Sequence, residues 1–254
     1  MSRAMVYFVG GGPGAPDLLT VRGARAIAAA DVVIWGRSLL MEAAVTEHAR
    51  PGAELLPWPP LSADELLAVY DRAQAEELVV ARLHSGDPAI FGRIREETRY
   101  VTDRGIPYEV VPGVSSMMAA AAVLGRELTV AGPPLGKEVA SAETLHALVV
   151  ARGGSRPPDV ERVAELAHHG TTMAIFMAAA EPEGLQRALL EGGLGPHTPC
   201  AVVHRVSWPE ELVLRCRLDE LAERVARHDL DHQTLLLVGP ALEDAGDSCV
   251  GGQP

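Results

Sequence analysis

The first 111 residues alternate short apolar runs with amphipathic segments, and this alternation limits the fold more than any other feature of the chain. Val6 to Val9 is typical of a buried strand that enters a glycine-rich loop, and Val32 to Trp35 indicates a second strand after a helix. Leu78 to Leu83 and Tyr108 to Val111 repeat the pattern. Because strands that alternate with helices form mostly parallel sheets, we expect an amino-terminal α/β domain over residues 1–113.

The sequence predicts where two helices of this domain begin. Ser62 and Glu65 have the spacing of a capping box, in which the Ser62 side chain accepts from the Glu65 amide, and the helix should end near Glu77. A further helix is expected from Ile90 to about Arg104.

The second half of the chain predicts a different sheet. Strands are expected at 171–177, 201–207, 212–216 and 235–238, with helices near 160–168, 184–190 and 218–228. Two of these strands are joined by the short connector Trp208 to Glu211, which favours a hairpin and therefore a mixed or antiparallel sheet. We expect a second domain over residues 114–242 and a disordered tail over 243–254.

The charge balance excludes several kinds of partner. Asp and Glu outnumber Lys and Arg by 34 to 22, for a formal charge of −12, and no basic stripe interrupts this excess. A nucleic-acid or anionic membrane partner is therefore not expected. With 48% hydrophobic and 22% charged residues, the chain has the composition of a globular protein and not of a disordered or fibrous one.

The cysteines and the amino terminus predict a compartment. Cys200, Cys216 and Cys249 have no zinc-site or CxxC spacing, which indicates free thiols in a reducing environment. The first residues lack the regions of a signal peptide, and no apolar run reaches the length of a membrane span. We expect a cytoplasmic, soluble protein, and the histidine spacing does not favour a metal site.

The loop from Gly10 to Ala15 formally fits the dinucleotide-binding pattern G-x-G-x-x-G/A. Two features oppose that interpretation. Pro13 removes one amide from the phosphate cradle, and Asp31 precedes its strand, whereas the ribose-binding acid of that fold follows it. A tight turn explains the glycines equally well, and the missing GK[ST] ending excludes a P-loop.

Two further loops also follow predicted strands, where open α/β sheets bind ligands. In Leu83 to Pro88, Asp87 is expected to cap the next helix with Pro88 at its first position, and small residues leave backbone amides open to a ligand. The third loop, Val110 to Ser116, resembles a nucleophile elbow, but Met117 stands where the final glycine is required, so a serine hydrolase is disfavoured.

Several segments together resemble one known family. They are VYFVGGGPGAPDLLT, RLHSGDPAIFGRIRE, GIPYEVVPGVSS, GREL, HGTTMAIFM, VVHRVSWPEE and LLLVGPAL. In this order they are similar to the tetrapyrrole (precorrin/corrin) methyltransferases, most closely to the precorrin-4 C11-methyltransferase branch of cobalamin synthesis. The resemblance covers nearly the whole chain, so it is far more specific than any single loop.

The resemblance implies a two-domain α/β homodimer with a mostly parallel amino-terminal sheet, a mixed carboxyl-terminal sheet and a cofactor cleft between them. It implies transfer of a methyl group from S-adenosylmethionine, leaving S-adenosylhomocysteine, to C11 of the polycarboxylated macrocycle precorrin-4 or cobalt-precorrin-4. The cofactor contacts carried over from the family are Pro13, Ser85, Gly86, Asp87, Ile90, Ser115, Ser116, Met177 and Val206. The candidate substrate contacts are His84, Arg93, Arg152, Arg156 and Arg205.

The chain departs from the family pattern at three places. Ala15 replaces the acid of the usual GPGDP, Ala151 replaces a threonine before Arg152, and the connector over 130–147, which holds the only lysine, Lys137, is longer than usual. A paralogue with another acceptor, a catalytically silent homologue that binds the cofactor or a tetrapyrrole, and an NAD-dependent oxidoreductase remain alternatives. No residue identifies itself as a catalytic base.

Overall fold

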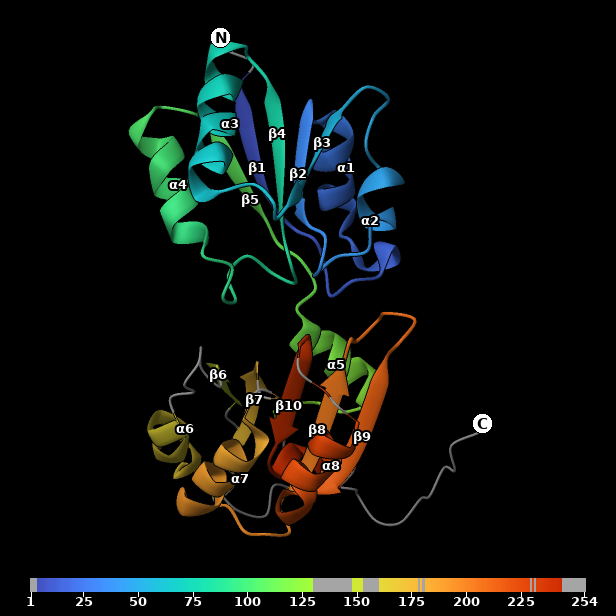
Figure 1. The fold of residues 1–254 in the computed structure, drawn as a ribbon, viewed down its shortest axis with the longest axis vertical. Helices are drawn as coiled ribbons and strands as arrows, with labels where there is room; N and C mark the ends of the chain where they lie inside the picture. The colour runs from blue at the N-terminus through green and yellow to red at the C-terminus, as the bar shows by residue number, and fades with distance from the viewer. Residues whose placement is uncertain are drawn as a thin grey trace, which may run out of the picture. The chain divides into compact units, whose positions relative to one another are not determined.

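A computed structural model describes residues 4–129, 148–152, 160–177, 179, 181–228, 230 and 232–243 (Figure 1). The chain divides into two compact units. The first contains residues 1–119 together with 206–209, and the second contains 120–205 and 210–254. The expectations for Lys137 and its connector, for Arg156 and for the tail beyond 243 lie outside the described residues.

The first unit is built on a parallel sheet in the order β3-β2-β4-β1-β5. Its strands are β1 Met5–Gly10, β2 Val32–Gly36, β3 Glu54–Trp58, β4 Val79–His84 and β5 Tyr108–Val111. Its helices are η1 Pro16–Leu18, α1 Val21–Ala29, α2 Ala43–Thr46, α3 Ala63–Ala75 and α4 Ile94–Asp103. Because every strand of this sheet is parallel, all their carboxyl ends meet at one edge.

Helices cover both faces of this sheet, with α1 and α2 on one side and α3 and α4 on the other (Figure 1). Successive residues of β1 show the alternation, because Phe8 packs in the core with α3 and α4 while Val9 packs in the core with α1 and α2. Such doubly covered strands are apolar throughout, which explains the continuous apolar runs in the sequence.

Asp31 ties the amino ends of the strands together. Its Oδ2 accepts from the Val79 amide at 2.7 Å, and its carboxylate pairs with Arg50. Asp31 therefore lies at the opposite end of β2 from the loops, where it cannot hold a ribose in the manner of a dinucleotide fold.

The second unit has a mixed sheet in the order β6-β7-β10-β8-β9, in which β6 pairs parallel with β7 and the other pairs are antiparallel. Its strands are β6 Leu148–Arg152, β7 Thr172–Phe176, β8 Pro199–His204, β9 Leu212–Arg217 and β10 Thr234–Val238. Its helices are α6 Val160–Ala167, α7 Pro182–Glu191, η3 Leu218–Glu220, α8 Leu221–Arg227 and η4 Pro240–Leu242. Helix α5, Ser116–Leu124, runs from the first unit into the second.

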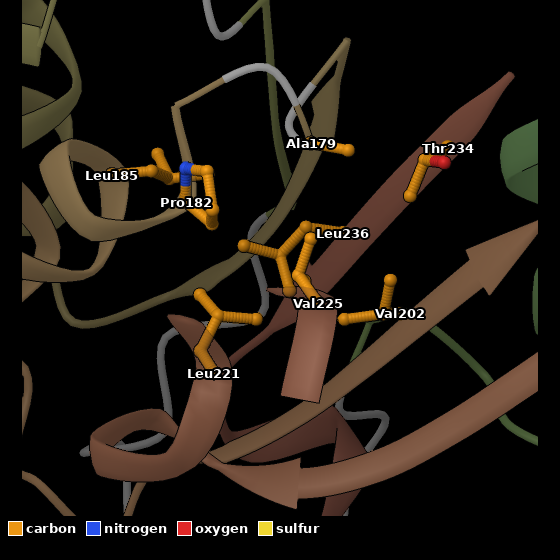
Figure 2. A pocket seen from close by; sticks show the side chains of 8 residues that line it. All are labelled: Ala179, Pro182, Leu185, Val202, Leu221, Val225, Thr234 and Leu236. Atoms are coloured by element: carbon orange, nitrogen blue, oxygen red, sulfur yellow. The ribbon is translucent and has the colours of Figure 1, made fainter. Parts of the chain in front are cut away.

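The core of the second unit is closely packed. Leu185 of α7 and Val225 of α8 meet Val202 and Leu236 of the sheet around a cavity of about 10 Å³ (Figure 2). A cavity of this volume holds at most one water molecule, and its apolar lining gives that water few partners. It is a packing defect and not a ligand site.

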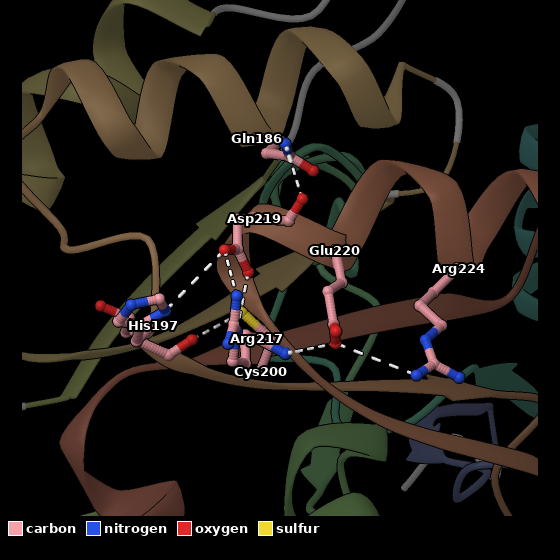
Figure 3. A network of polar contacts seen from close by, with 8 residues as sticks. Gln186, His197, Cys200, Arg217, Asp219, Glu220 and Arg224 are labelled. Atoms are coloured by element: carbon pink, nitrogen blue, oxygen red, sulfur yellow. Dashed lines mark hydrogen bonds and ion pairs between the residues drawn. The ribbon is translucent and has the colours of Figure 1, made fainter.

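A chain of surface ion pairs joins β9 to α8 (Figure 3). Arg217 pairs with Asp219, and Asp219 also lies 3.8 Å from His197. The Arg217 amide donates to Glu220, whose carboxylate lies 3.9 Å from Arg224. These residues order the turn that leads from the sheet into the helix.

The α/β class, the parallel first sheet and the mixed second sheet are confirmed. The capping box of α3 is also confirmed, since the Glu65 amide donates to Ser62 Oγ at 3.2 Å and the Ser62 amide donates to Glu65. The hairpin is present as β8 and β9, which pair antiparallel on either side of the 205–211 connector.

One helix boundary was predicted incorrectly. Helix α4 begins at Ile94 and not at Ile90, because Phe91 and Arg93 have positive φ angles of 56° and 53° that interrupt a helical path. Asp87 is therefore not the cap of this helix, and Pro88 is not its first residue.

Candidate functional site

Three loops meet at the carboxyl edge of the first sheet because the strands they follow are neighbours. Strand β1 lies between β4 and β5, so the loop from Gly10 to Ala15 lies between those that follow His84 and Val111. The Gly11 amide donates to the His84 carbonyl at 2.8 Å. This edge is where open α/β sheets bind ligands.

The three loops approach so closely that only glycine fits at the junction. A Cβ on Gly10 would lie 2.4 Å from the Gly113 nitrogen, and a Cβ on Gly113 would lie 2.3 Å from the Gly86 carbonyl oxygen. Gly12 and Gly86 exchange backbone hydrogen bonds of 3.2 and 2.7 Å. The junction is therefore made of backbone alone and leaves the outer parts of the loops to face a ligand.

Asp87 joins the second loop to the third. Its Oδ1 accepts from the Ala89 amide at 2.7 Å, and its Oδ2 accepts from the Gly113 amide at 2.9 Å. The sequence singled out Asp87 as a helix cap, whereas its carboxylate closes a local turn and holds the third loop in place. In both roles, helix cap and loop fastening, the carboxylate accepts hydrogen bonds from backbone N–H groups. The residue type alone therefore could not distinguish them.

The remaining first-unit candidates lie around this junction. Ser85 is exposed, while Ile90 and Ser116 are half-buried. Ser115 is buried and its carbonyl accepts from the Met118 and Ala119 amides at 3.0 Å, which places it at the start of α5. Small hydroxyl-bearing residues and one branched apolar side chain thus border the loop junction.

His84 ends β4 beside these loops but points into the protein interior, with its ring 6.0 Å from that of Phe8. Burial, with a smaller contribution from the nearby Arg82, lowers the pKa of His84 to about 4. The ring forms a hydrogen bond with the Gly92 backbone, and its Nε2 has no hydrogen-bond partner among the described residues. His84 is therefore neutral at physiological pH.

Behind His84 lies a buried charge cluster that the sequence did not predict. Arg82 Nε lies 3.4 Å from Glu97 Oε2, and Tyr70 donates its hydroxyl to the same oxygen. Burial, together with the neighbouring Glu97 carboxylate, raises the pKa of Tyr70 well above its usual value. The guanidinium also lies 5.4 Å from the Trp58 ring centroid. This cluster joins α3 and α4 to β4 beneath the loops.

The second unit gathers its candidates at the ends of strands that run in the same direction. Arg152 ends β6 and Met177 follows β7, and Arg152 Nε donates to Met177 Sδ at 3.1 Å. Arg205 follows β8, where it pairs with Glu210 at 3.6 Å. Arg93, by contrast, lies in the first unit before α4 and pairs with Glu96.

Ser207 and Trp208 lie in the family-like segment VVHRVSWPEE, but no sequence pattern assigns either residue a role. Both contact the first loop, and Val206 beside them is buried. Their partners lie more than 190 residues away in the sequence, so no local pattern signals the contact.

An open hollow of about 640 Å³ lies beside the residues that directly follow the first loop. Its lining comes from η1, α1 and α2 and includes Pro16, Val21, Arg25 and His48. Among the described residues, no group of three or more His, Cys, Asp or Glu side chains is arranged to hold a metal ion. None of the described helices combines the length and apolar character needed to cross a membrane.

These observations define an α/β protein with a glycine-built ligand edge on one parallel sheet and a second unit with a mixed sheet. A family model described as Tetrapyrrole (Corrin/Porphyrin) Methylases matches residues 5–222. The chain belongs to this family, which confirms the resemblance and the prediction of a methyltransferase.

Named relatives match along almost the whole chain. A cobalt-precorrin-4 C(11)-methyltransferase of Methanocaldococcus jannaschii is 36% identical, over 93% of this chain and 88% of the relative. A precorrin-4 C(11)-methyltransferase of Mycobacterium tuberculosis is 37% identical over 95% of this chain and 92% of the relative.

Solved structures of methyltransferases also match this chain along most of its length. That of a cobalt precorrin-4 methyltransferase of cobalamin biosynthesis has a TM-score of 0.86 at 30% identity, with 96% of this chain and 98% of that chain covered. A uroporphyrin-III C-methyltransferase from Thermus thermophilus, complexed with S-adenosylhomocysteine, has a TM-score of 0.72 at 29% identity, with 94% and 98% covered.

Proposed function

We propose that this chain transfers a methyl group from S-adenosylmethionine to C11 of precorrin-4 or cobalt-precorrin-4, a step of cobalamin synthesis. The glycine-built junction at the carboxyl edge of the first sheet carries the proposal, because it presents backbone groups and small polar side chains where a cofactor is expected. The named relatives supply the acceptor, since the two quoted above are methyltransferases for this position.

The residues at the junction fit the chemistry of the cofactor. S-adenosylmethionine carries an adenine, ribose hydroxyls and an amino-acid end, which call for apolar walls and many hydrogen-bonding groups. Ile90 supplies an apolar side chain, and Ser85, Ser115 and Ser116 supply hydroxyl and amide groups. The cofactor contacts proposed here are Pro13, Ser85, Gly86, Asp87, Ile90, Ser115, Ser116, Met177 and Val206.

When bound, S-adenosylmethionine supplies a methyl group on a sulfonium sulfur, which is already an activated leaving group. The protein therefore needs no nucleophile of its own, and its work is to hold the reacting atoms in line at roughly 3 to 3.5 Å. Asp87 contributes by fixing the second and third loops to each other through two amide hydrogen bonds. A neutral, buried His84 lies beneath the second loop.

Cationic side chains are proposed to hold the carboxylates of the macrocycle. Arg152 is exposed and reaches Met177, so a candidate substrate contact and a candidate cofactor contact lie together at the strand ends of the second unit. Arg93, Arg156 and Arg205 are the other cationic candidates. His84 was also a candidate from the resemblance, but its buried, neutral ring does not suit a carboxylate. Arginine suits this task because its planar donors match a carboxylate in two-point contacts.

Calorimetric titration with S-adenosylhomocysteine, run beside NAD, tests the cofactor directly. We expect micromolar binding of the former, about 8 kcal/mol, and none of the latter. The Asp87→Ala variant should bind about 1 to 2 kcal/mol more weakly, because it leaves two loop amides without their partner. Asp103→Ala, which removes a carboxylate from the exposed part of α4, is the matched control and should bind normally.

Turnover of precorrin-4, with and without cobalt, then tests the acceptor. A chain that binds S-adenosylhomocysteine but methylates neither form is a paralogue for another acceptor or a silent homologue. A chain that binds no S-adenosylhomocysteine would overturn the proposed function. We also propose that the protein is cytoplasmic and forms a homodimer. Cys200 and Cys216 are both free thiols, which a reducing compartment favours. Light scattering after size exclusion measures the dimer.

A further inference from the structure

The segment Val206–Pro209 belongs to the first unit although it is a connector of the second. It joins β8 to β9, whose residues group with the second unit, while the four connector residues group with the first. Such a segment is held by something other than its own hairpin.

Two side-chain hydrogen bonds hold this segment against the first loop. Trp208 Nε1 donates to the Pro13 carbonyl oxygen at 3.0 Å, and the Ala15 amide donates to Ser207 Oγ at 3.1 Å. Both distances are those of well-formed hydrogen bonds. The two bonds lie on either side of Gly14, so they hold the outer half of the loop at two points.

The indole of Trp208 also occupies the space beside Gly14. A Cβ built on Gly14 would lie 2.1 Å from Trp208 Nε1 and 2.5 Å from Cδ1. The φ angle of Gly14 is +154°, a value that side-chain-bearing residues rarely adopt. Gly14 and Trp208 therefore form a matched pair, in which the missing side chain of one makes room for the ring of the other.

The backbone of this segment includes an unfavourable conformation. Ser207 has a φ angle of 69°, in the left-handed region that side chains disfavour, and Arg205, just before the segment, has one of 46°. Such conformations persist where surrounding contacts impose them, and they cluster at functional sites. The bonds to Pro13 and Ala15 are contacts of this kind.

The loop is thus fixed from two sides. Its inner half, Gly10 to Gly12, is bound to His84 and Gly86 by backbone hydrogen bonds. Its outer half, Pro13 to Ala15, is bound by Trp208 and Ser207. No side chain caps the short helix η1 that follows Ala15. The Ser207 hydroxyl fixes this position from outside instead.

We propose that Ser207 and Trp208 are positioning residues that hold Pro13 to Ala15 in the conformation that receives the cofactor. This inference rests on the proposed function, which assigns Pro13 to the cofactor. Neither side chain needs to touch the reacting atoms. Loss of either side chain should lower the affinity for the cofactor. Without these hydrogen bonds the loop must become ordered when the cofactor binds, and the cost of ordering it lowers the apparent affinity.

Two conservative variants test the proposal. Trp208→Phe keeps a ring beside Gly14 but removes the N–H donor, and Ser207→Ala removes only the hydroxyl. Each should weaken S-adenosylhomocysteine binding about 5- to 10-fold, which is the usual effect of one lost hydrogen bond. The KM for S-adenosylmethionine should rise by the same factor while kcat at saturation changes less than about twofold.

Tyr100→Phe is the matched control. It also removes one side-chain donor of the first unit, because the Tyr100 hydroxyl donates to Asp71 at 2.9 Å on the exposed side of α3 and α4. The affinity of this control variant for S-adenosylhomocysteine should stay within about twofold of that of the original chain. Near-normal circular dichroism of all three variants establishes that the folded proteins are being compared.

Amide hydrogen exchange separates this proposal from the proposed function, because it needs no ligand. In Ser207→Ala the Ala15 amide should exchange about tenfold faster, since it loses its acceptor. Unchanged exchange, or faster exchange with unchanged affinity, would overturn the positioning role. If the original chain binds no S-adenosylhomocysteine, the proposed function fails and the positioning role fails with it, whereas weakened binding confined to the two variants supports both.

Discussion

The two sheets position their candidate site residues by different means. In the first unit every strand is parallel, and the loops that follow β1, β4 and β5 meet through glycine backbone. In the second unit the sheet is mixed, and the ends of β6 and β7 bring together the long side chains of Arg152 and Met177. A site built from backbone tolerates almost no added atom, whereas a site built from exposed side chains can change residue by residue without disturbing the fold.

Gly113→Ala is expected to have the largest effect. The added Cβ would lie 2.3 Å from the Gly86 carbonyl oxygen and 2.7 Å from the Gly10 Cα, and neither is the end of a flexible side chain. We expect a loss of about 4 kcal/mol of unfolding free energy, because two loops must move apart. Urea unfolding followed by tryptophan fluorescence measures it, since Trp35, Trp58 and Trp208 all lie in the first unit.

Gly105→Ala is the control for this change. Gly105 also lies in the first unit and has a φ angle of +68°, but a Cβ there meets no atom within 4 Å. It should cost about 1 kcal/mol, from backbone strain alone. Equal losses of unfolding free energy in the two variants would show that the loops at Gly113 can make room for a Cβ.

Glu97→Gln should have the next largest effect. Its carboxylate faces Arg82 in the interior, where the two side chains are 11% and 10% exposed. Removing the negative charge leaves a buried guanidinium without its partner, which typically costs about 3 kcal/mol. The same urea unfolding experiment reports it.

Glu220→Gln is the counterpart in the second unit. Glu220 belongs to the ion pairs at the start of α8, where both it and Arg224 are more than a third exposed (Figure 3). Its loss should cost less than about 1 kcal/mol, because water already solvates both charges. Hydrogen exchange of the α8 amides measures this effect, since the second unit contains no tryptophan.

The stability of the first unit should also depend on pH through His84. The folded chain keeps this ring neutral down to about pH 4, whereas the unfolded chain protonates it near pH 6.5. Between these values the unfolded state binds more protons, so the unfolding free energy falls as the pH falls. At pH 5 the loss from this group should be about 2 kcal/mol.

His84→Asn isolates this contribution. Carboxylates also titrate in acid, so the informative quantity is the difference between the two chains in their loss of stability from pH 7 to pH 5. The original chain should lose about 2 kcal/mol more than the variant. Parallel losses would indicate that His84 is protonated in the folded protein.

The sequence predicted those parts of the fold that depend on neighbours along the chain. The capping box at Ser62 and the strand Tyr108–Val111 have the expected positions, because caps and short apolar runs are local signals. Strand β3, Glu54–Trp58, was missed because Pro57 interrupts it. It is an edge strand, where a missing N–H donor is tolerated.

The site was less predictable, because its contacts link distant residues. The loops could be found one by one, but the bond from Asp87 to the Gly113 amide spans 26 residues, and that from Trp208 to Pro13 spans 195. No periodicity encodes either. Helix α4 shows the same limit, since its late start follows from the positive φ angles at Phe91 and Arg93.

Arg152→Ala is expected to have the smallest effect on stability and a clear effect on function. The side chain is exposed at the end of β6, and its described hydrogen bond is to a thioether sulfur, a weak acceptor. The unfolding free energy should change by less than about 0.5 kcal/mol. If Arg152 holds a substrate carboxylate, the KM for the tetrapyrrole should rise about tenfold while S-adenosylhomocysteine affinity stays unchanged.

Arg99→Ala, which removes an exposed arginine from α4, should change neither quantity. A large loss of stability in Arg152→Ala would show that Arg152 is needed for folding, as the glycines of the loop junction are. The two sheets would then not differ in how their site residues contribute to stability. A change in KM alone would show that an exposed side chain of the second unit contributes to acceptor binding without contributing to the stability of the fold.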